Sequence, residues 1–126
     1  MTERRPAYLA ELDPCIERAV LTVLEYRIGR DMAISRAQLR TEVARLGFPA
    51  HERVIRATVN SLRKAGHLIC STGGEGGGYW MGMNWQEVDE FITQEVHARL
   101  VDLAETEAAL KRAAEAKWGP EQFQLF

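Results

Sequence analysis

Cysteine is scarce in this chain, and long apolar runs are missing from it. The 126 residues include two cysteines, Cys15 and Cys70, which lie far apart, so a disulfide framework is not expected. No apolar run approaches the roughly 18 residues of a membrane span, and the first residues lack the apolar segment of a signal peptide. We therefore expect a cytoplasmic protein with reduced cysteines and no membrane association, in which Cys70 serves as a small apolar strand residue.

Side chains that carry enzyme chemistry are also thinly spread. His51, His67 and His97 are dispersed, and no cysteine or paired carboxylate accompanies them at metal-ligand spacing. The glycine-rich stretch 72–78 lacks the Gly-Lys-Ser/Thr of a phosphate-binding loop and precedes a strand-like run, whereas such a loop precedes a helix. We expect a protein that is not an enzyme and that needs no cofactor and no metal.

Positive charge is present, but it is concentrated in one part of the chain. The net charge is −2, divided as −1 over residues 1–29, +4 over residues 30–80 and −5 over residues 81–126. A basic middle segment is the electrostatic pattern that phosphate binding requires. The acidic last third is then not expected to lie along nucleic acid.

The stretch 51–66 in this basic segment has the pattern of a two-faced helix. At about 100° per residue, one face carries Ile55, Val59 and Leu62, with Val54, Thr58 and Ala65 beside them. Glu52 lies in the first turn, where the helix dipole favours an anion, and Gly66 ends the helix. Arginine pairs with guanine edges and phosphates and asparagine with adenine, which suits the opposite face, composed of Arg53, Arg56, Asn60, Arg63 and Lys64. A solvated amphipathic helix is the alternative.

Two helices are expected before this stretch. Asp13-Pro14 is a typical start for the first, which runs to about Arg27 and ends at Gly29. The second begins at a capping box, Ser35 followed by Gln38, and Gly47 stops it. Its buried stripe is Leu39, Val43 and Leu46, Phe48 anchors the tight connection that follows, and the isolated Ile34 before it forms at most a very short strand.

Two strand-like runs, 67–71 and 79–83, flank the glycine-rich loop and predict a β-hairpin. Three helices followed by a hairpin resemble the winged helix-turn-helix family. The resemblance covers residues 13–83 and rests on the order of the Ser35 start after Ile34, the basic helix through Gly66, the loop and Tyr79-Trp80. It implies double-stranded DNA binding, with the second helix of the helix-turn-helix in the major groove and the hairpin on the minor groove or backbone. The hairpin tip departs from the family pattern because it carries Glu75 and no Lys or Arg.

A second capping box, Asn84 with Glu87, starts a helix that no Gly or Pro interrupts before Trp118. Its length of about 50 Å exceeds what a small domain can cover, and Glu107 with Lys111 forms a favourable i, i+4 pair. Ion pairing alone could support this helix. We favour self-association into a homodimer through the apolar stripe Ile92, Val96, Leu100, Leu103 and Leu110.

Gly119-Pro120 breaks this helix, and the chain ends in Gln122-Phe-Gln-Leu125-Phe126. This ending resembles the pentapeptide by which bacterial replication and repair proteins bind the sliding clamp, in which Gln, Leu and an aromatic residue are fixed. The resemblance implies that Gln122 bonds near the pocket mouth and that Leu125 and Phe126 fill an apolar cleft. A tail packed on the protein's own core is the alternative. The combination looks like small proteins of phage and prophage replication regions.

The expected fold is mostly α with a small β-hairpin: a flexible arm (1–12), a winged helix-turn-helix domain (13–83), one long helix (84–118) and a linear tail (119–126). The expected function is double-stranded DNA binding linked to replication through a sliding clamp. The alternatives are a dimeric transcriptional repressor and a protein-interaction module that binds no DNA. The expected DNA-contacting residues are Arg36, Arg40, His51, Arg53, Arg56, Asn60, Arg63 and Lys64.

Overall fold

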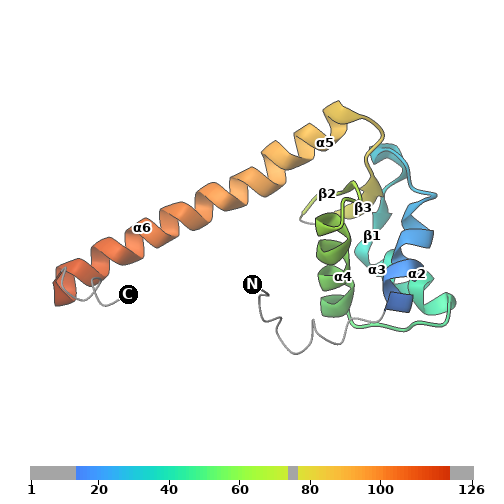
Figure 1. Cartoon of the computed structure of the whole chain (residues 1–126), viewed down its shortest axis with the longest axis horizontal. Coiled ribbons are helices and arrows are strands. Elements are labelled where there is room, and N and C mark those ends of the chain that lie inside the picture. Colours follow the sequence, from blue (N-terminus) through green and yellow to red (C-terminus); the bar gives the residue numbers. More distant parts are fainter. Residues whose placement is uncertain (1–13, 74–76, 120–126) are drawn as a thin grey trace. The chain divides into compact units, whose positions relative to one another are not determined.

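The structure, a computed structural model, describes residues 14–73 and 77–119. It is mostly helical, with a small three-stranded antiparallel sheet and a long C-terminal helix (Figure 1). The elements in chain order are α2 (Pro14–Leu24), the 3₁₀ turn η1 (Arg30–Met32), β1 (Ile34–Ser35), α3 (Arg36–Arg45), α4 (Glu52–Lys64), β2 (Ile69–Ser71), β3 (Gly78–Met81), α5 (Trp85–Phe91), the π-helix η2 (Ile92–His97) and α6 (Ala98–Trp118). None of the helices in the described ranges is long and apolar enough to cross a membrane.

The chain divides into two compact units, the first ending at Phe91 and the second beginning at Ile92. We expected a boundary at 83/84, before α5. The helix α5 belongs to the first unit because Val88 and Phe91 pack against the buried Cys70 and Trp80. Two predicted features, the arm 1–12 and the cap at Asp13, lie outside the described residues.

The first helix ends earlier than the sequence indicated, at Leu24 and not near Arg27. The backbone of Arg27 and Gly29 is used instead to extend the sheet. The N–H of Met81 donates to the carbonyl of Arg27 at 2.7 Å, and the N–H of Gly29 donates to the carbonyl of Met81 at 2.9 Å. Gly29 adopts a φ of 91°, a conformation that glycine reaches without the steric cost of a Cβ.

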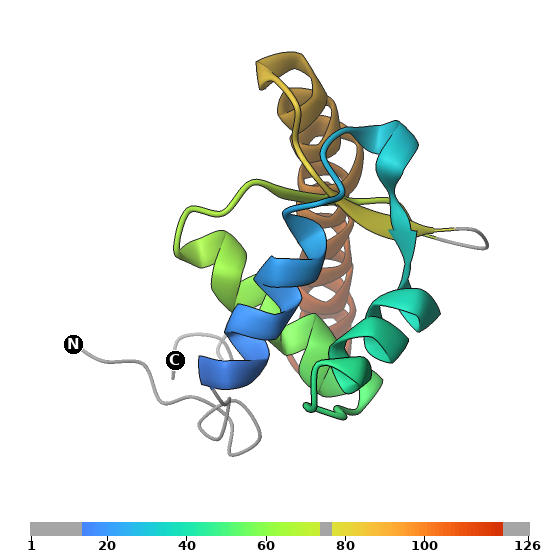
Figure 2. The ribbon, with the colours of Figure 1, turned by 90° about the vertical axis from the view of Figure 1, so that its right-hand side faces the viewer.

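The helix α2 packs against both α3 and α4 (Figure 2). The N-cap predicted at Ser35 is confirmed, since the N–H of Gln38 donates to the Ser35 hydroxyl oxygen at 3.1 Å. The prediction that Leu46 belongs to the buried stripe is wrong, because Leu46 is the C-cap of α3 and remains 47% exposed. Phe48 packs on the core instead, after the turn at Gly47. The buried residues of this core are Ala19, Val20, Leu24, Ile34, Leu39, Val43, Ile55, Val59, Leu62, Ile69 and Tyr79.

The sheet has the strand order β1-β3-β2, with both pairs antiparallel. The predicted hairpin is therefore present as β2 and β3, in which Cys70 pairs with Trp80. The very short strand expected at Ile34 is present as well, and Ile34 pairs with Tyr79. As a result β1 fixes the start of α3 to the hairpin.

The helix α5 is attached through one carboxylate. The cap predicted at Asn84 is confirmed, because its side-chain oxygen accepts from the N–H of Glu87 at 2.9 Å. The Glu87 carboxylate accepts from the indole N–H of Trp80 at 2.8 Å, the N–H of Met83 at 3.1 Å and the N–H of Arg30 at 3.3 Å. One side chain thus joins α5, β3 and the start of η1.

The second unit contains η2 and α6. An uninterrupted α-helix from residue 85 to 118 was expected, and this is wrong because residues 92–97 form a π-helix. The apolar residues Ile92, Val96 and Leu100 are each four apart, and such steps drift by about 40° around an α-helix. The wider turn of a π-helix, with its i→i+5 hydrogen bonds, reduces that drift. The helix end at Trp118 is confirmed, with Gly119 as the cap at a φ of 87°.

Candidate nucleic-acid interface

The helix α4 has one buried and one exposed face, as its sequence predicts. Ile55, Val59 and Leu62 are at most 4% exposed. The hydroxyl of the buried Thr58 donates to the carbonyl of Val54 at 2.7 Å, so this buried polar group has a hydrogen-bond partner. The opposite face is exposed and carries three cations and one amide at helical spacing: Arg53, Arg56, Asn60 and Lys64. Apolar packing thus holds this basic face toward solvent.

His51 has a structural role at the start of this helix. It is the N-cap of α4, and its Nδ1 accepts from the N–H of Arg53 at 3.1 Å. In the neutral imidazole the proton therefore lies on Nε2, which acts as a donor. His51 is exposed, so a contact through Nε2 is compatible with the capping role.

Arg63 was grouped with the exposed cations, but the structure places it between elements. Its guanidinium donates to the carbonyl of Ile69 at 2.8 Å and to the hydroxyl of Ser71 at 2.9 Å, both on β2. It also donates to the side-chain oxygen of Asn60 at 3.3 Å and lies 4.8 Å from the ring centroid of Phe91. Arg63 therefore ties the end of α4 to the sheet and α5, and it holds the Asn60 amide in orientation.

A groove of about 860 Å³ lies between α3 and the start of α4. Arg36 and Arg40 come from α3, and each is positioned by a backbone carbonyl: Arg36 donates to Thr72 at 3.4 Å, and Arg40 donates to Ala50 at 3.0 Å. The first of these bonds joins α3 to the residue that follows β2. The lining residues are Arg36, Ala37, Arg40, Thr41, Ala44, Pro49, Ala50, His51 and Glu52.

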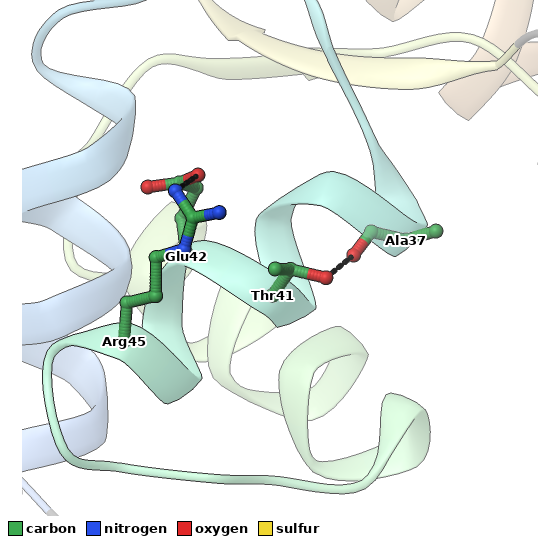
Figure 3. Close-up of polar contacts among 4 residues, drawn as sticks. All are labelled: Ala37, Thr41, Glu42 and Arg45. Atoms are coloured by element: carbon green, nitrogen blue, oxygen red, sulfur yellow. Dashed lines mark hydrogen bonds and ion pairs between the residues drawn. The ribbon is translucent and has the colours of Figure 1, made fainter.

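Thr41 also lines this groove and was not predicted from the sequence. The apolar stripe of α3 indicates its buried face only, whereas Thr41 lies on the outward face with Ala37, Arg40 and Ala44, at i, i+3 and i+4 spacing. The Thr41 hydroxyl donates to the carbonyl of Ala37 at 3.0 Å, and Arg45 nearby pairs with Glu42 at 3.1 Å (Figure 3). Glu42 partly offsets the charge of Arg45, and Arg45 does not line the groove as Arg36 and Arg40 do.

Cys70 is confirmed as a buried strand residue, 1% exposed. The pKa of its thiol is raised to about 11, mainly by burial and also by the charge of Glu87, while Arg63 acts in the opposite direction. The side chain is thus a neutral thiol near neutral pH, which is unsuited to nucleophilic chemistry. Within residues 14–73 and 77–119, no group of three or more His, Cys, Asp or Glu is placed to hold a metal ion.

The structure brings Arg36, Arg40 and His51 together around one groove and places Arg53, Arg56, Asn60 and Lys64 along the outer face of α4. The predicted dimerisation residues belong to the second unit and are all exposed, from 43% at Ile92 to 66% at Leu103 and Leu110. Glu75 of the hairpin tip and the tail residues Gln122, Leu125 and Phe126 lie outside the described residues. Comparisons with protein-family models, with curated proteins and with solved structures find no match.

Proposed function

We propose that the first unit is a winged helix-turn-helix domain that binds double-stranded DNA in the major groove through α4. The order α2, β1, α3, α4, β2, β3 and the strand order β1-β3-β2 support this domain type. The observation that carries the proposal is the outer face of α4, where Arg53, Arg56, Asn60 and Lys64 are exposed on a helix anchored by its other face. In this proposal the protein is a cytoplasmic binding module and not an enzyme.

In this proposal the outer face of α4 contacts the bases, and the groove between α3 and α4 contacts the phosphates. Arg53 and Arg56, with Asn60 held by Arg63, offer the fork and amide geometries that read base edges. Arg36 and Arg40 in the groove, with Lys64 at the end of α4, contact phosphates and fix the register. Arg63 fixes the end of α4 against β2, and His51 adds a hydrogen-bond donor beside the groove.

The test is binding of the full chain to a labelled duplex of random sequence, followed by fluorescence anisotropy while the salt is raised from about 50 to about 200 mM. If Arg36, Arg40 and Lys64 contact phosphate, the logarithm of the binding constant should fall against the logarithm of salt with a slope of about −2.7. Binding that is absent at low salt would contradict the DNA proposal and favour the protein-interaction module.

A dimeric transcriptional repressor is the second candidate, and the exposed apolar residues of the second unit favour it. It shares the DNA-binding surface but assigns no clamp partner to the tail. Enrichment of a palindrome from a random pool of duplexes is expected for a repressor, because half-sites mirror the two-fold symmetry of the protein. Clamp binding by the tail distinguishes the two candidates, because the repressor has no clamp partner.

We further propose that the last residues bind a bacterial sliding clamp and so tie DNA binding to replication of the phage or prophage type. This rests on the sequence Gln122-Phe-Gln-Leu125-Phe126 alone. Purified clamp should bind the full chain and fail to bind a chain that ends at Pro120. The double variant Leu125→Ala/Phe126→Ala should match the truncated chain. Equal clamp binding by full and truncated chains, or binding by neither, would remove the clamp from the account.

A further inference from the structure

Within the described part of the second unit, the side chains of α6 have little packing around them. It has 21 residues, about 31 Å at 1.5 Å per residue, and all of them but the half-buried Ala114 are exposed. Large apolar side chains are among them: Leu100 is 62% exposed, Leu110 66% and Trp118 60%. Most helical stability in proteins comes from packing of an apolar face, so this helix needs a surface to pack against.

One face of α6 has the spacing of a helix-pairing seam. Six residues follow each other at steps of four, three, four, three and four, which is the heptad pattern, and they lie within about 80° of one another. Leu103 and Leu110 flank this face on one side. The seam consists of Leu100, Ala104, Glu107, Lys111, Ala114 and Trp118.

The seam is complementary to itself when reversed. A second copy running in the opposite direction, with the two-fold axis at the level of residue 109 along the helix, places Glu107 opposite Lys111 and Ala104 opposite Ala114. Leu100 then faces Trp118 at both ends, and the two Leu110 side chains meet beside the axis. Two acid–base contacts, two close alanine contacts and two apolar ends result.

The parallel arrangement in register lacks this complementarity. It would place Glu107 against Glu107 and Lys111 against Lys111, and like charges at facing positions disfavour pairing. In the single chain, Glu107 accepts from Lys111 at 2.9 Å while both side chains stay more than half exposed. The antiparallel pair keeps this bond and adds the opposite charge of the second copy on the other side.

We propose that α6 is a self-association helix that pairs antiparallel with α6 of a second copy of this chain, centred between Glu107 and Lys111. The alanines at the seam allow close approach of the backbones, and the Glu107–Lys111 contacts set the direction. This arrangement does not depend on DNA binding, so either proposal can fail alone.

Disulfide trapping tests the direction of pairing. In a full chain with Cys15→Ser, which removes the exposed thiol, Ala104→Cys and Ala114→Cys are made separately. Mixed and then oxidised, the two variants should form a cross-linked heterodimer, because facing residues bring their Cα atoms within disulfide range. Each variant oxidised alone should stay uncrosslinked. A homodimer cross-linked through Ala104→Cys alone would show parallel pairing, and no cross-link in any sample would overturn self-association at this seam.

Charge reversal gives an independent readout by sedimentation. Glu107→Lys should raise the dimer dissociation constant about 4- to 30-fold, since two attractive contacts become repulsive. Glu107→Lys/Lys111→Glu should restore dimerisation. Glu105→Lys makes the same charge change off the seam and should leave the dissociation constant unchanged. A Glu107→Lys variant that dimerises like the original chain would contradict the antiparallel arrangement.

Discussion

An Arg56→Ala variant is expected to bind its preferred duplex about 5- to 150-fold more weakly than the original chain. The side chain lies on the exposed face of α4, one turn from Arg53 and Asn60. A bidentate contact between arginine and guanine contributes about 1–3 kcal/mol of discrimination, and each 1.4 kcal/mol is a factor of ten in affinity. The stability of the domain should hardly change, because Arg56 is exposed and surface substitutions usually stay within about 0.5 kcal/mol.

The measurement is anisotropy on a duplex selected from a random pool, with thermal unfolding recorded in parallel. Arg18→Ala is the matched control, since it removes the same charge from an exposed position on α2, outside the proposed surface. Arg56→Lys separates the two roles: it should restore binding if Arg56 contacts phosphate and fail to restore it if Arg56 reads a base, because an ammonium lacks the fork of a guanidinium. Unchanged affinity in Arg56→Ala would remove this residue from the interface.

The periodicity of α4 was sufficient to predict its two faces. The buried Ile55, Val59 and Leu62 and the exposed Arg53 and Arg56 follow from 3.6 residues per turn, which is a local property of the chain. The caps at Ser35 and Asn84 are local as well, since each bond spans three residues. Such features can be predicted from sequence because both partners lie in the same short window.

The role of Arg63 depends on partners that lie outside α4. Ile69 and Ser71 lie on β2 and Phe91 on α5, so the contacts exist only once the sheet and α5 are packed beside α4. On a helical projection Arg63 looks like another solvent-facing cation. Glu87 was likewise predicted as half of a capping box, but its carboxylate binds Trp80 in the neighbouring strand. Tertiary contacts redirect both side chains.

A Gly78→Ala variant is expected to lose about 3 kcal/mol of unfolding free energy, at the upper end of the cost of overpacking a core. Gly78 pairs with Ser35 across β1 and β3, and a Cβ at this position would overlap the backbone carbonyl oxygen of Ile34. Backbone atoms cannot rotate away, so the strands must separate. Ile34 is fully buried and Ser35 caps α3, so the separation disturbs the core and the start of α3 together.

Thermal unfolding followed by circular dichroism and Trp fluorescence measures this loss, which corresponds to a fall in Tm on the order of 10–20 °C. Gly73→Ala is the matched control, because a Cβ at Gly73 meets no atom within 4 Å and should shift the stability by less than about 0.5 kcal/mol. If the stability of Gly78→Ala equalled that of Gly73→Ala, β1 would not lie against β3 at this point. Since that pairing fixes the start of α3, and with it Arg36, beside the hairpin, a folded Gly78→Ala chain should also bind duplex DNA more weakly.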